Sequence, residues 1–235
     1  MTKKADTLQI INLDGRDVPV RIRRNARARR AILRVDTDNE GALVTLPSRA
    51  SEREALLLVQ DKSGWLLAKL DNLPKKIPFE DGAKIPMLGE KYTLRHDPDL
   101  IGVALKQDGE IRISGRPEHF TRRFLDWLKR QAKSEIEFRA FDMAASLDRK
   151  IGRITVRDTK SRWGSCAPNG NLSFCWRLIM TPEWVMDYVV AHEVSHLRHM
   201  DHSAAFWQTV AGFDVQVDAA RNWLNDNAEQ LQRYG

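Results

Sequence analysis

The sequence predicts an α+β protein in which a β-rich N-terminal region precedes a more helical C-terminal region. Short apolar runs that alternate with polar residues fill the first half, and turn dipeptides such as Asp14-Gly15 and Asp108-Gly109 separate them. A long amphipathic helical pattern begins after Gly115. The composition, with 42% apolar and 30% charged residues over 235 positions, is that of a folded chain and excludes disorder as the main state.

The change of pattern at Gly115 predicts a domain boundary near that residue. We expect residues 1–115 to form a β-rich accessory or substrate-binding region with one helix, and residues 116–235 to form a second domain. In the first region, alternation predicts strands over residues 8–13, 18–24, 32–35, 42–46, 91–94, 103–106 and 110–113. Ser51 is a good N-cap for a helix that runs to about Leu70. The segment 73–90 is rich in Pro and Gly and is expected to be a loop.

The second region is expected to begin with a long helix that ends near Leu147. Strands follow over residues 154–157, 161–166 and 172–176, with a tight turn at Asn169-Gly170 between the last two. Further helices are expected to start at the N-caps Thr181, Ser203 and Asp214, and the first of them is expected to run to about Arg198. No internal repeat is detectable in the sequence.

The charge and the cysteine content exclude several classes of protein. The net charge of +6 favours anionic partners only mildly, and two cysteines cannot build a disulfide scaffold, which fits a reduced, cytoplasmic setting. The N-terminus lacks the apolar run of a signal peptide, and no window approaches the roughly 18 consecutive apolar residues of a membrane span. We therefore expect no membrane association.

One segment concentrates positive charge. The stretch Arg21 to Arg34 contains seven arginines and no acidic residue. Such a run can bind a nucleotide or a nucleic acid, but alternation along a strand would also place these arginines on one solvated face. Both interpretations remain open at the level of sequence.

The most specific motif is His192-Glu193-Val194-Ser195-His196, an H-E-x-x-H pattern on a predicted helix. Residues four apart lie one turn apart on the same face, so His192 and His196 can direct two imidazoles at one ion. Glu193 is close enough to act on a water at that ion as general base. The apolar neighbours predict a buried helix, on which two histidines and a glutamate need polar partners. Zn²⁺ with an open fourth position is the expected cofactor.

A catalytic zinc site needs a third ligand, and two histidines lie close by in the sequence. On a continued helix His199 would lie roughly 10 Å along the axis from His192, too far to share one ion. His202 follows in a segment that has the composition of a turn, because Ser203 is expected to cap the next helix. We therefore expect His202 to be the third metal ligand.

Three functions fit a site of this kind. The first is a zinc-dependent peptidase, the second a metal-dependent phosphohydrolase that acts on nucleoside triphosphates through the basic N-terminal region, and the third a binding module that keeps zinc for stability. The general base Glu193 argues against the third, because a structural zinc usually has four protein ligands and needs no base.

The residues around the motif resemble a known family. The segment Ser161-Arg162-Trp163-Gly164-Ser165-Cys166, the run from Tyr188 to Ser203, and Phe206-Trp207 are similar to the YgjP-like metallopeptidases, which are related to SprT-like and minigluzincin proteases. The resemblance extends over about residues 15–232. It implies a zincin-like C-terminal domain, zinc on His192, His196 and His202, and Glu193 as catalytic residue, whereas the substrates of the family are poorly established.

The zincin resemblance also suggests where a substrate lies. Zincins hold an extended peptide against a strand edge beside the motif helix, and residues 161–166 or 172–176 could supply that edge by β-strand addition. Arg162 or Arg177 is expected to bind an anionic group or the transition-state oxyanion there. The alternative for each arginine is an ion pair at the surface. Tyr188 is expected to be either a core residue or an oxyanion donor.

Overall fold

The computed structural model describes residues 6–235. The expectation that the N-terminus carries no signal peptide concerns in part residues 1–5, which lie outside the described residues. Two compact units are present, Met1–Lys75 and Lys76–Gly235, and each combines helices with sheets, which confirms the α+β class. This division differs from the expected boundary at residue 115. The strands between residues 84 and 113 share one hydrophobic core with the long helix that follows them, and therefore belong to the second unit.

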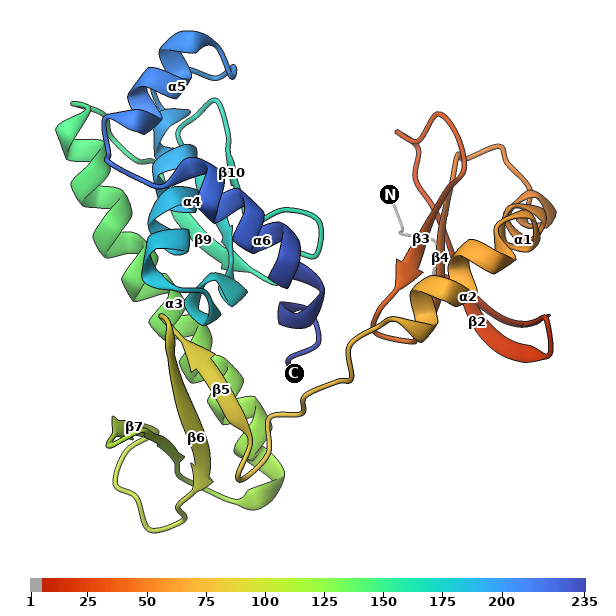
Figure 1. Cartoon of the computed structure of the whole chain (residues 1–235), viewed down its shortest axis with the longest axis horizontal. Helices are drawn as coiled ribbons and strands as arrows, with labels where there is room; N and C mark the ends of the chain where they lie inside the picture. The colour runs from red at the N-terminus through yellow and green to blue at the C-terminus, as the bar shows by residue number, and fades with distance from the viewer. Residues whose placement is uncertain (1–5) are drawn as a thin grey trace. The chain divides into compact units, whose positions relative to one another are not determined.

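The first unit is a four-stranded sheet with two helices (Figure 1). Its strands are β1 (Thr7–Leu13), β2 (Arg16–Arg24), β3 (Ile32–Asp36) and β4 (Gly41–Leu46), in the order β1-β2-β4-β3. Its helices are α1 (Glu52–Asp61) and α2 (Ser63–Asp71). A capping box at Ser51 confirms the expected helix start. One continuous helix to Leu70 was expected, but the helix breaks at Lys62, where φ is −106° and ψ is 20°.

The arginine run follows the alternation of strand β2. Val20 and Ile22 are buried in the core with the helices, so Arg21 and Arg23 project from the other face of the sheet. Arg21 pairs with the buried carboxylate of Asp36 at 3.0 Å. Arg23 donates to the Thr45 hydroxyl at 3.0 Å. Part of the run thus has partners within the chain, and a nucleotide or nucleic-acid role for Arg21–Arg34 stays a prediction.

The second unit opens with another four-stranded sheet. Its strands are β5 (Lys84–Met87), β6 (Glu90–His96), β7 (Ala104–Gln107) and β8 (Glu110–Ile113), in the order β5-β6-β8-β7. Its pairings repeat those of the first sheet, with two antiparallel hairpins joined by one parallel pair, although no repeat was visible in the sequence. Strand β5 was expected to be loop. Pro86 is tolerated there because β5 is an edge strand.

A 27-residue helix, α3 (Phe120–Ser146), follows a short 3₁₀ turn, η1 (Pro117–His119), and carries a row of buried apolar residues along one face. The third sheet consists of β9 (Ile154–Arg157), β10 (Gly164–Cys166) and β11 (Leu172–Cys175), in the order β10-β11-β9. Strand β11 is central and β10 lies at an edge. The free thiols of Cys166 and Cys175 are not paired across the hairpin, since Cys166 lies opposite Leu172.

The remaining elements are a 3₁₀ turn, η2 (Trp176–Met180), and the helices α4 (Glu183–Ser195), α5 (Ala204–Ala211) and α6 (Val217–Leu231). In Figure 1, α4 lies between α3 and α6, and it contacts both. Ser203 caps α5 as expected. The N-cap of the last helix is Gln216 and not Asp214, whose φ of 54° is left-handed and therefore not the extended conformation of an N-cap. None of the described helices combines the length and apolarity needed to cross a membrane.

Candidate metal centre

Helix α4 runs through the core of the second unit and carries the first four residues of the H-E-x-x-H motif, and His196 is its C-cap. Its residues are buried on nearly every side, by α3, by α6 and by strand β10. The helix ends at Ser195, and the chain then reverses through a turn held by hydrogen bonds from the amides of Leu197 and His199 to α4 carbonyls. The helix therefore ends before Arg198, the end expected from the sequence. This early end brings the following residues back over the motif.

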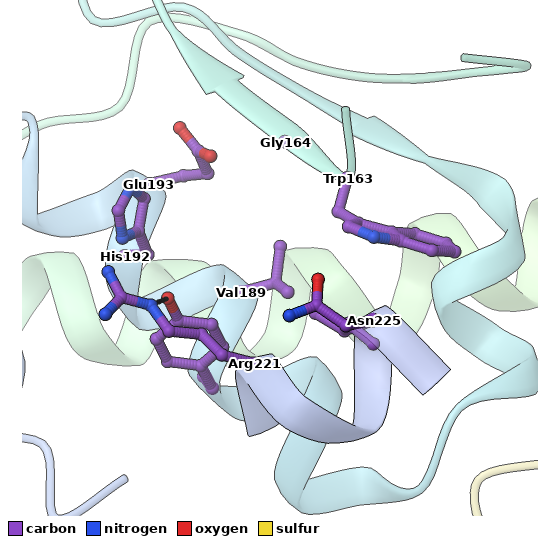
Figure 2. A pocket seen from close by; sticks show the side chains of 9 residues that line it. Trp163, Gly164, Val189, His192, Glu193, Arg221 and Asn225 are labelled. Carbon is purple, nitrogen blue, oxygen red and sulfur yellow. Dashed lines mark hydrogen bonds between the residues drawn. The ribbon is translucent and has the colours of Figure 1, made fainter. Parts of the chain in front are cut away.

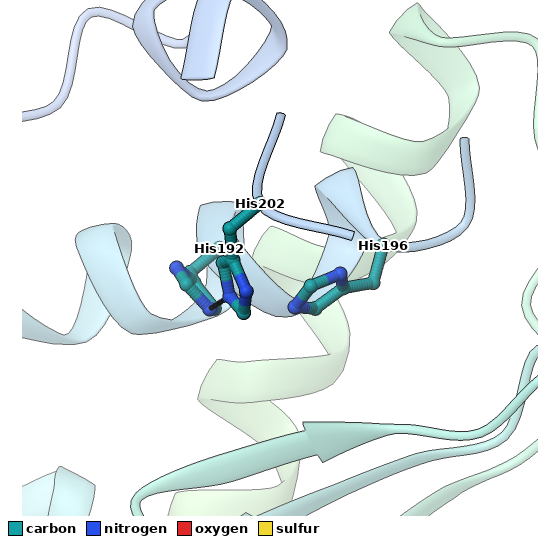
Figure 3. A group of neighbouring side chains, drawn as sticks. All are labelled: His192, His196 and His202. Atoms are coloured by element: carbon teal, nitrogen blue, oxygen red, sulfur yellow. Dashed lines mark hydrogen bonds between the residues drawn. The ribbon is translucent and has the colours of Figure 1, made fainter. Parts of the chain in front are cut away.

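The reversal brings three histidines together (Figure 3). Ligand nitrogens of His192, His196 and His202 all lie within 4.8 Å of one another. The Nε2 atoms of His192 and His202 are 3.2 Å apart. His199 lies elsewhere, because its side chain lines a different cavity beside α5. The structure therefore assembles the three histidines expected from the sequence and leaves out the alternative.

The donor set and its spacing fit a zinc ion. Zinc–nitrogen bonds of about 2.0–2.1 Å at a tetrahedral angle separate two ligand nitrogens by roughly 3.3 Å, close to the separation in the His192–His202 pair. The Nδ1 atom of His192 has no hydrogen-bond partner among residues 6–235, but it is Nε2 of this ring that faces His202. The fit therefore rests on the spacing of the nitrogens and on the donor chemistry.

The backbone sets the tautomer of one of these rings. Nδ1 of His196 lies 2.9 Å from the carbonyl oxygen of His199 and can only donate to it. The Nε2 lone pair of His196 is then directed at the cluster, as in metal-binding histidines whose second nitrogen donates to a carbonyl. His199 thus contributes its carbonyl to the site and not its side chain.

Burial also sets the charge of the rings. Burial, together with smaller contributions from the neighbouring His196, His202 and Arg221, lowers the pKa of His192 to about 4. Burial likewise lowers the pKa of His196. The neutral imidazole is the form that binds a metal, so these two rings are ready to bind one at neutral pH.

Glu193 lies next to the first histidine and is almost completely buried, with 6% of its surface exposed. Burial raises the pKa of its carboxyl group to about 7, and the charge of Arg162 opposes this rise. A carboxyl group with a pKa near neutrality is suited to both accepting and releasing a proton. The helix side chain reaches this position because β10 passes close by at a glycine. A Cβ atom added at Gly164 would lie 2.5 Å from Cγ of Glu193.

This close approach gives a first testable prediction. The substitution Gly164→Ala forces the Glu193 carboxylate to move, and misplacement of a reacting group by about 1 Å can lower a rate on the order of 10²-fold. We expect Gly164→Ala to lower turnover by that order while zinc content stays unchanged. Gly64→Ala is the matched control, because its added Cβ meets nothing within 4 Å. Full activity of the Gly164→Ala protein would contradict the prediction.

A cavity of about 400 Å³ opens beside His192 and Glu193 (Figure 2). Its other walls come from β10, from α4 and from α6, through Trp163, Gly164, Tyr188, Val189, Arg221, Leu224 and Asn225. Arg221 and Asn225 are one turn apart on α6, so both face the same space. The cavity is therefore lined by polar groups from α6 as well as by the motif helix.

The guanidinium of Arg221 is held in place from two sides. Its Nε donates to the hydroxyl of Tyr188 at 3.0 Å, and its carbon lies 4.5 Å from the centre of the Trp207 ring. Because the Tyr188 oxygen accepts this hydrogen bond, its own proton is free to be donated into the cavity. Two groups that can stabilise negative charge thus lie beside His192.

Two aromatic residues of α5 support the three imidazoles. The buried ring of Phe206 has its centre 5.0, 4.6 and 4.9 Å from those of His192, His196 and His202, respectively. The Trp207 ring is stacked on His202 at 5.9 Å. The imidazole rings are therefore packed against a fixed surface, which limits their motion without a bound ion.

Comparison with known proteins places the chain in a family. A model described as YgjP-like, metallopeptidase domain, matches residues 29–227. The chain belongs to the YgjP-like metallopeptidase family. It is also similar, with 20% sequence identity and a TM-score of 0.34, to the crystal structure of the metallopeptidase zymogen of Pyrococcus abyssi abylysin. That similarity covers 44% of this chain and 97% of the other. No curated protein matches the chain.

The two arginines expected at the substrate have different places in this YgjP-like metallopeptidase. Arg162 is exposed near Glu193 and stays a candidate. Arg177 is only 4% exposed, stacks on Trp176, and does not line the cavity. Its guanidinium group pairs with Asp158 and donates to the carbonyl oxygens of Leu231 and Tyr234. Arg177 thus stabilises the position of the C-terminal segment through these hydrogen bonds. The geometry does not support the substrate contact expected for this residue.

Sequence reasoning missed two residues of the cavity, Arg221 and Asn225. Both lie on a helix whose apolar pattern was recognised, and their spacing of four residues is a visible signal. The signal is weak because polar residues four apart also occur on any solvated helix face. The packing of α6 against α4 in this YgjP-like metallopeptidase is needed to show that the α6 face with Arg221 and Asn225 lines a cavity.

Proposed function

We propose that this protein is a zinc-dependent peptidase in which His192, His196 and His202 hold the ion and Glu193 is the general base. Membership of a metallopeptidase family supports the reaction class. The observation that carries the proposal is the convergence of three imidazoles, within 4.8 Å, beside a buried carboxyl group. Three protein ligands leave one position of a tetrahedral ion open, which is typical of catalytic and not of structural zinc.

A bound zinc ion would supply a Lewis acid that polarises the scissile carbonyl and acidifies a water molecule. Glu193 accepts the proton of that water and then passes it to the leaving amine. Its buried position between α4 and β10 keeps the carboxyl group away from bulk water, and its pKa near 7 suits both steps. Neutral nitrogen donors favour zinc over the hard cations Mg²⁺ and Ca²⁺.

We expect the substrate to be an extended peptide bound along β10. Strand β11 is paired on both sides, by β10 and β9, so of the two expected edges only β10 has a side that no strand of residues 6–235 occupies. A peptide added to this edge would gain main-chain hydrogen bonds and pass Gly164, where the strand approaches Glu193. The scissile bond would then lie next to the general base.

Tyr188 and Arg221 are suited to stabilise the transition state. Amide hydrolysis places negative charge on the former carbonyl oxygen, and preorganised donors at that position lower the barrier. The Tyr188 hydroxyl is fixed by Arg221 and has a proton to donate. We propose that this pair contacts the oxyanion.

One experiment separates the peptidase from its two alternatives. The zinc-loaded protein is incubated with unfolded protein, with peptides and with nucleoside triphosphates, before and after removal of the metal by a chelator. We expect zinc-dependent cleavage of peptide bonds. Phosphate release without peptide cleavage would replace the proposal with a nucleotide phosphohydrolase. Zinc that raises stability without any turnover would replace it with a zinc-stabilised binding module.

A further inference from the structure

A second depression, separate from the cavity, lies on the third sheet of the second unit. This groove has a volume of about 600 Å³. The strand register places Ser165, Ser173 and Thr155 side by side across β10, β11 and β9, and all three line the groove. Phe174 and Val156, which alternate with them, pack into the hydrophobic core. The groove is therefore formed on the solvent-facing, hydroxyl-rich side of this sheet.

The lining of the groove is cationic. It includes four basic side chains and no acidic one, namely Arg153, Arg157, Lys160 and Arg162. The three arginines are exposed, and none of them forms an ion pair within residues 6–235. The nearby carboxylate of Asp158 is bound by Arg177 instead. The exposed guanidinium groups of Arg153 and Arg157, which form no ion pair within residues 6–235, give the groove a positive potential that attracts acidic ligands.

The groove adjoins the candidate metal centre through strand β10. Trp163 and Gly164 line the cavity beside His192 and Glu193, while their neighbours Arg162 and Ser165 line the groove. Because side chains alternate along a strand, the cavity and the groove lie on opposite faces of the β10 edge. A peptide paired with this edge would direct alternate side chains toward the cavity and toward the groove.

We propose that this groove binds an acidic segment of the polypeptide substrate, on one side of the scissile bond. The inference rests on the peptidase function proposed above. The guanidinium group of an arginine can donate two parallel hydrogen bonds to one carboxylate, and the serine and threonine hydroxyls supply further donors. An acidic peptide is favoured over a nucleic acid because the groove shares strand β10 with the candidate metal centre, and because no aromatic side chain lines it for base stacking.

Quenched peptides test this proposal in the full-length, zinc-loaded protein. Each carries the same central segment, with an acidic block on its N-terminal or C-terminal side, and in a matched set Asn and Gln replace Asp and Glu. We expect the variant Arg153→Glu/Arg157→Glu to raise KM for one acidic series roughly tenfold, because two ion pairs become repulsions. The kcat value and the cleavage of the neutral peptides should stay unchanged, and the KM difference should shrink at high salt.

Two further variants control the experiment. Arg116→Glu/Arg130→Glu introduces the same charge change at two exposed arginines of this unit that do not line the groove, and it should behave as wild type. Arg153→Gln/Arg157→Gln removes the two positive charges without adding negative ones. It tests the same proposal if the glutamate variant folds poorly. Equal KM changes for acidic and neutral peptides, or none, would overturn the proposal.

Binding separates failure of this inference from failure of the proposed function. Fluorescence anisotropy with the Glu193→Gln protein reports the affinity for the acidic peptides without turnover. If no peptide is cleaved but acidic peptides bind through Arg153 and Arg157, the peptidase function fails and the groove still selects acidic polypeptides. If a single-stranded RNA of equal length binds more tightly through the same arginines, the assignment to polypeptide is overturned.

Discussion

Glu193→Gln should strongly slow peptide hydrolysis and leave zinc binding intact. The two side chains have the same shape, so the amide fits the same buried position beside Gly164. The amide has no basic oxygen for the proton of the attacking water, and general acid–base catalysis contributes roughly 10²–10⁴-fold. We expect kcat to fall by about that factor, measured with a quenched peptide at fixed zinc content.

Stability provides a second measurement on the same variant. Burial raises the pKa of Glu193 to about 7 because the charged carboxylate is disfavoured at this position. A neutral glutamine should therefore not weaken the fold. Glu183→Gln, at the exposed first turn of the same helix, is the matched control and should keep full activity. Wild-type turnover in the Glu193→Gln protein would remove Glu193 from its role as base.

His202→Ala should strongly weaken zinc binding without unfolding the protein. The imidazole lies on an exposed turn, so the apolar packing lost is confined to its contacts with Phe206 and Trp207. Loss of an outer hydrogen-bond partner typically costs metal affinity about 10–100-fold, and loss of a ligand itself should cost more. We expect the dissociation constant for zinc, measured by competition with a chelating dye, to rise by more than about 100-fold.

His199→Ala separates this effect from general damage to the turn. Its side chain lies outside the cluster, and its carbonyl oxygen, which accepts the hydrogen bond of His196, is kept in the variant. Zinc affinity should change little. If His199→Ala and His202→Ala weaken zinc equally, the third ligand has been assigned to the wrong residue.

The parts of the structure that sequence could predict depend on contacts between near neighbours. The caps at Ser51 and Ser203 are decided by bonds to residues three positions away, and both are found where expected. The turn that returns His202 to the motif was inferred from the position of the next cap. Each of these features needs only about one helical turn of sequence to be visible.

The parts that could not be predicted depend on partners far along the chain. Strand β5 contains Pro86 and lies in a segment whose composition predicts a loop. Its strand conformation depends on pairing with β6, which the local sequence does not show. The expected boundary at residue 115 differs from the division at Lys75 because a change of sequence pattern does not reveal the core shared by β5–β8 and α3. The sequence predicts a substrate contact for Arg177, but its partners are Asp158 and two carbonyl oxygens near the C-terminus. These two carbonyl groups lie more than 50 residues away along the chain.

All three candidate ligands lie within one short segment, from His192 to His202. Closing so short a loop has a small entropic cost, so the unfolded chain retains part of the affinity for a metal. Only the difference in affinity between folded and unfolded states adds to stability. Zinc should therefore protect this protein against denaturation less than a site built from distant segments would. The same short spacing should allow a nascent chain to bind the ion before its long-range β-sheet pairings form.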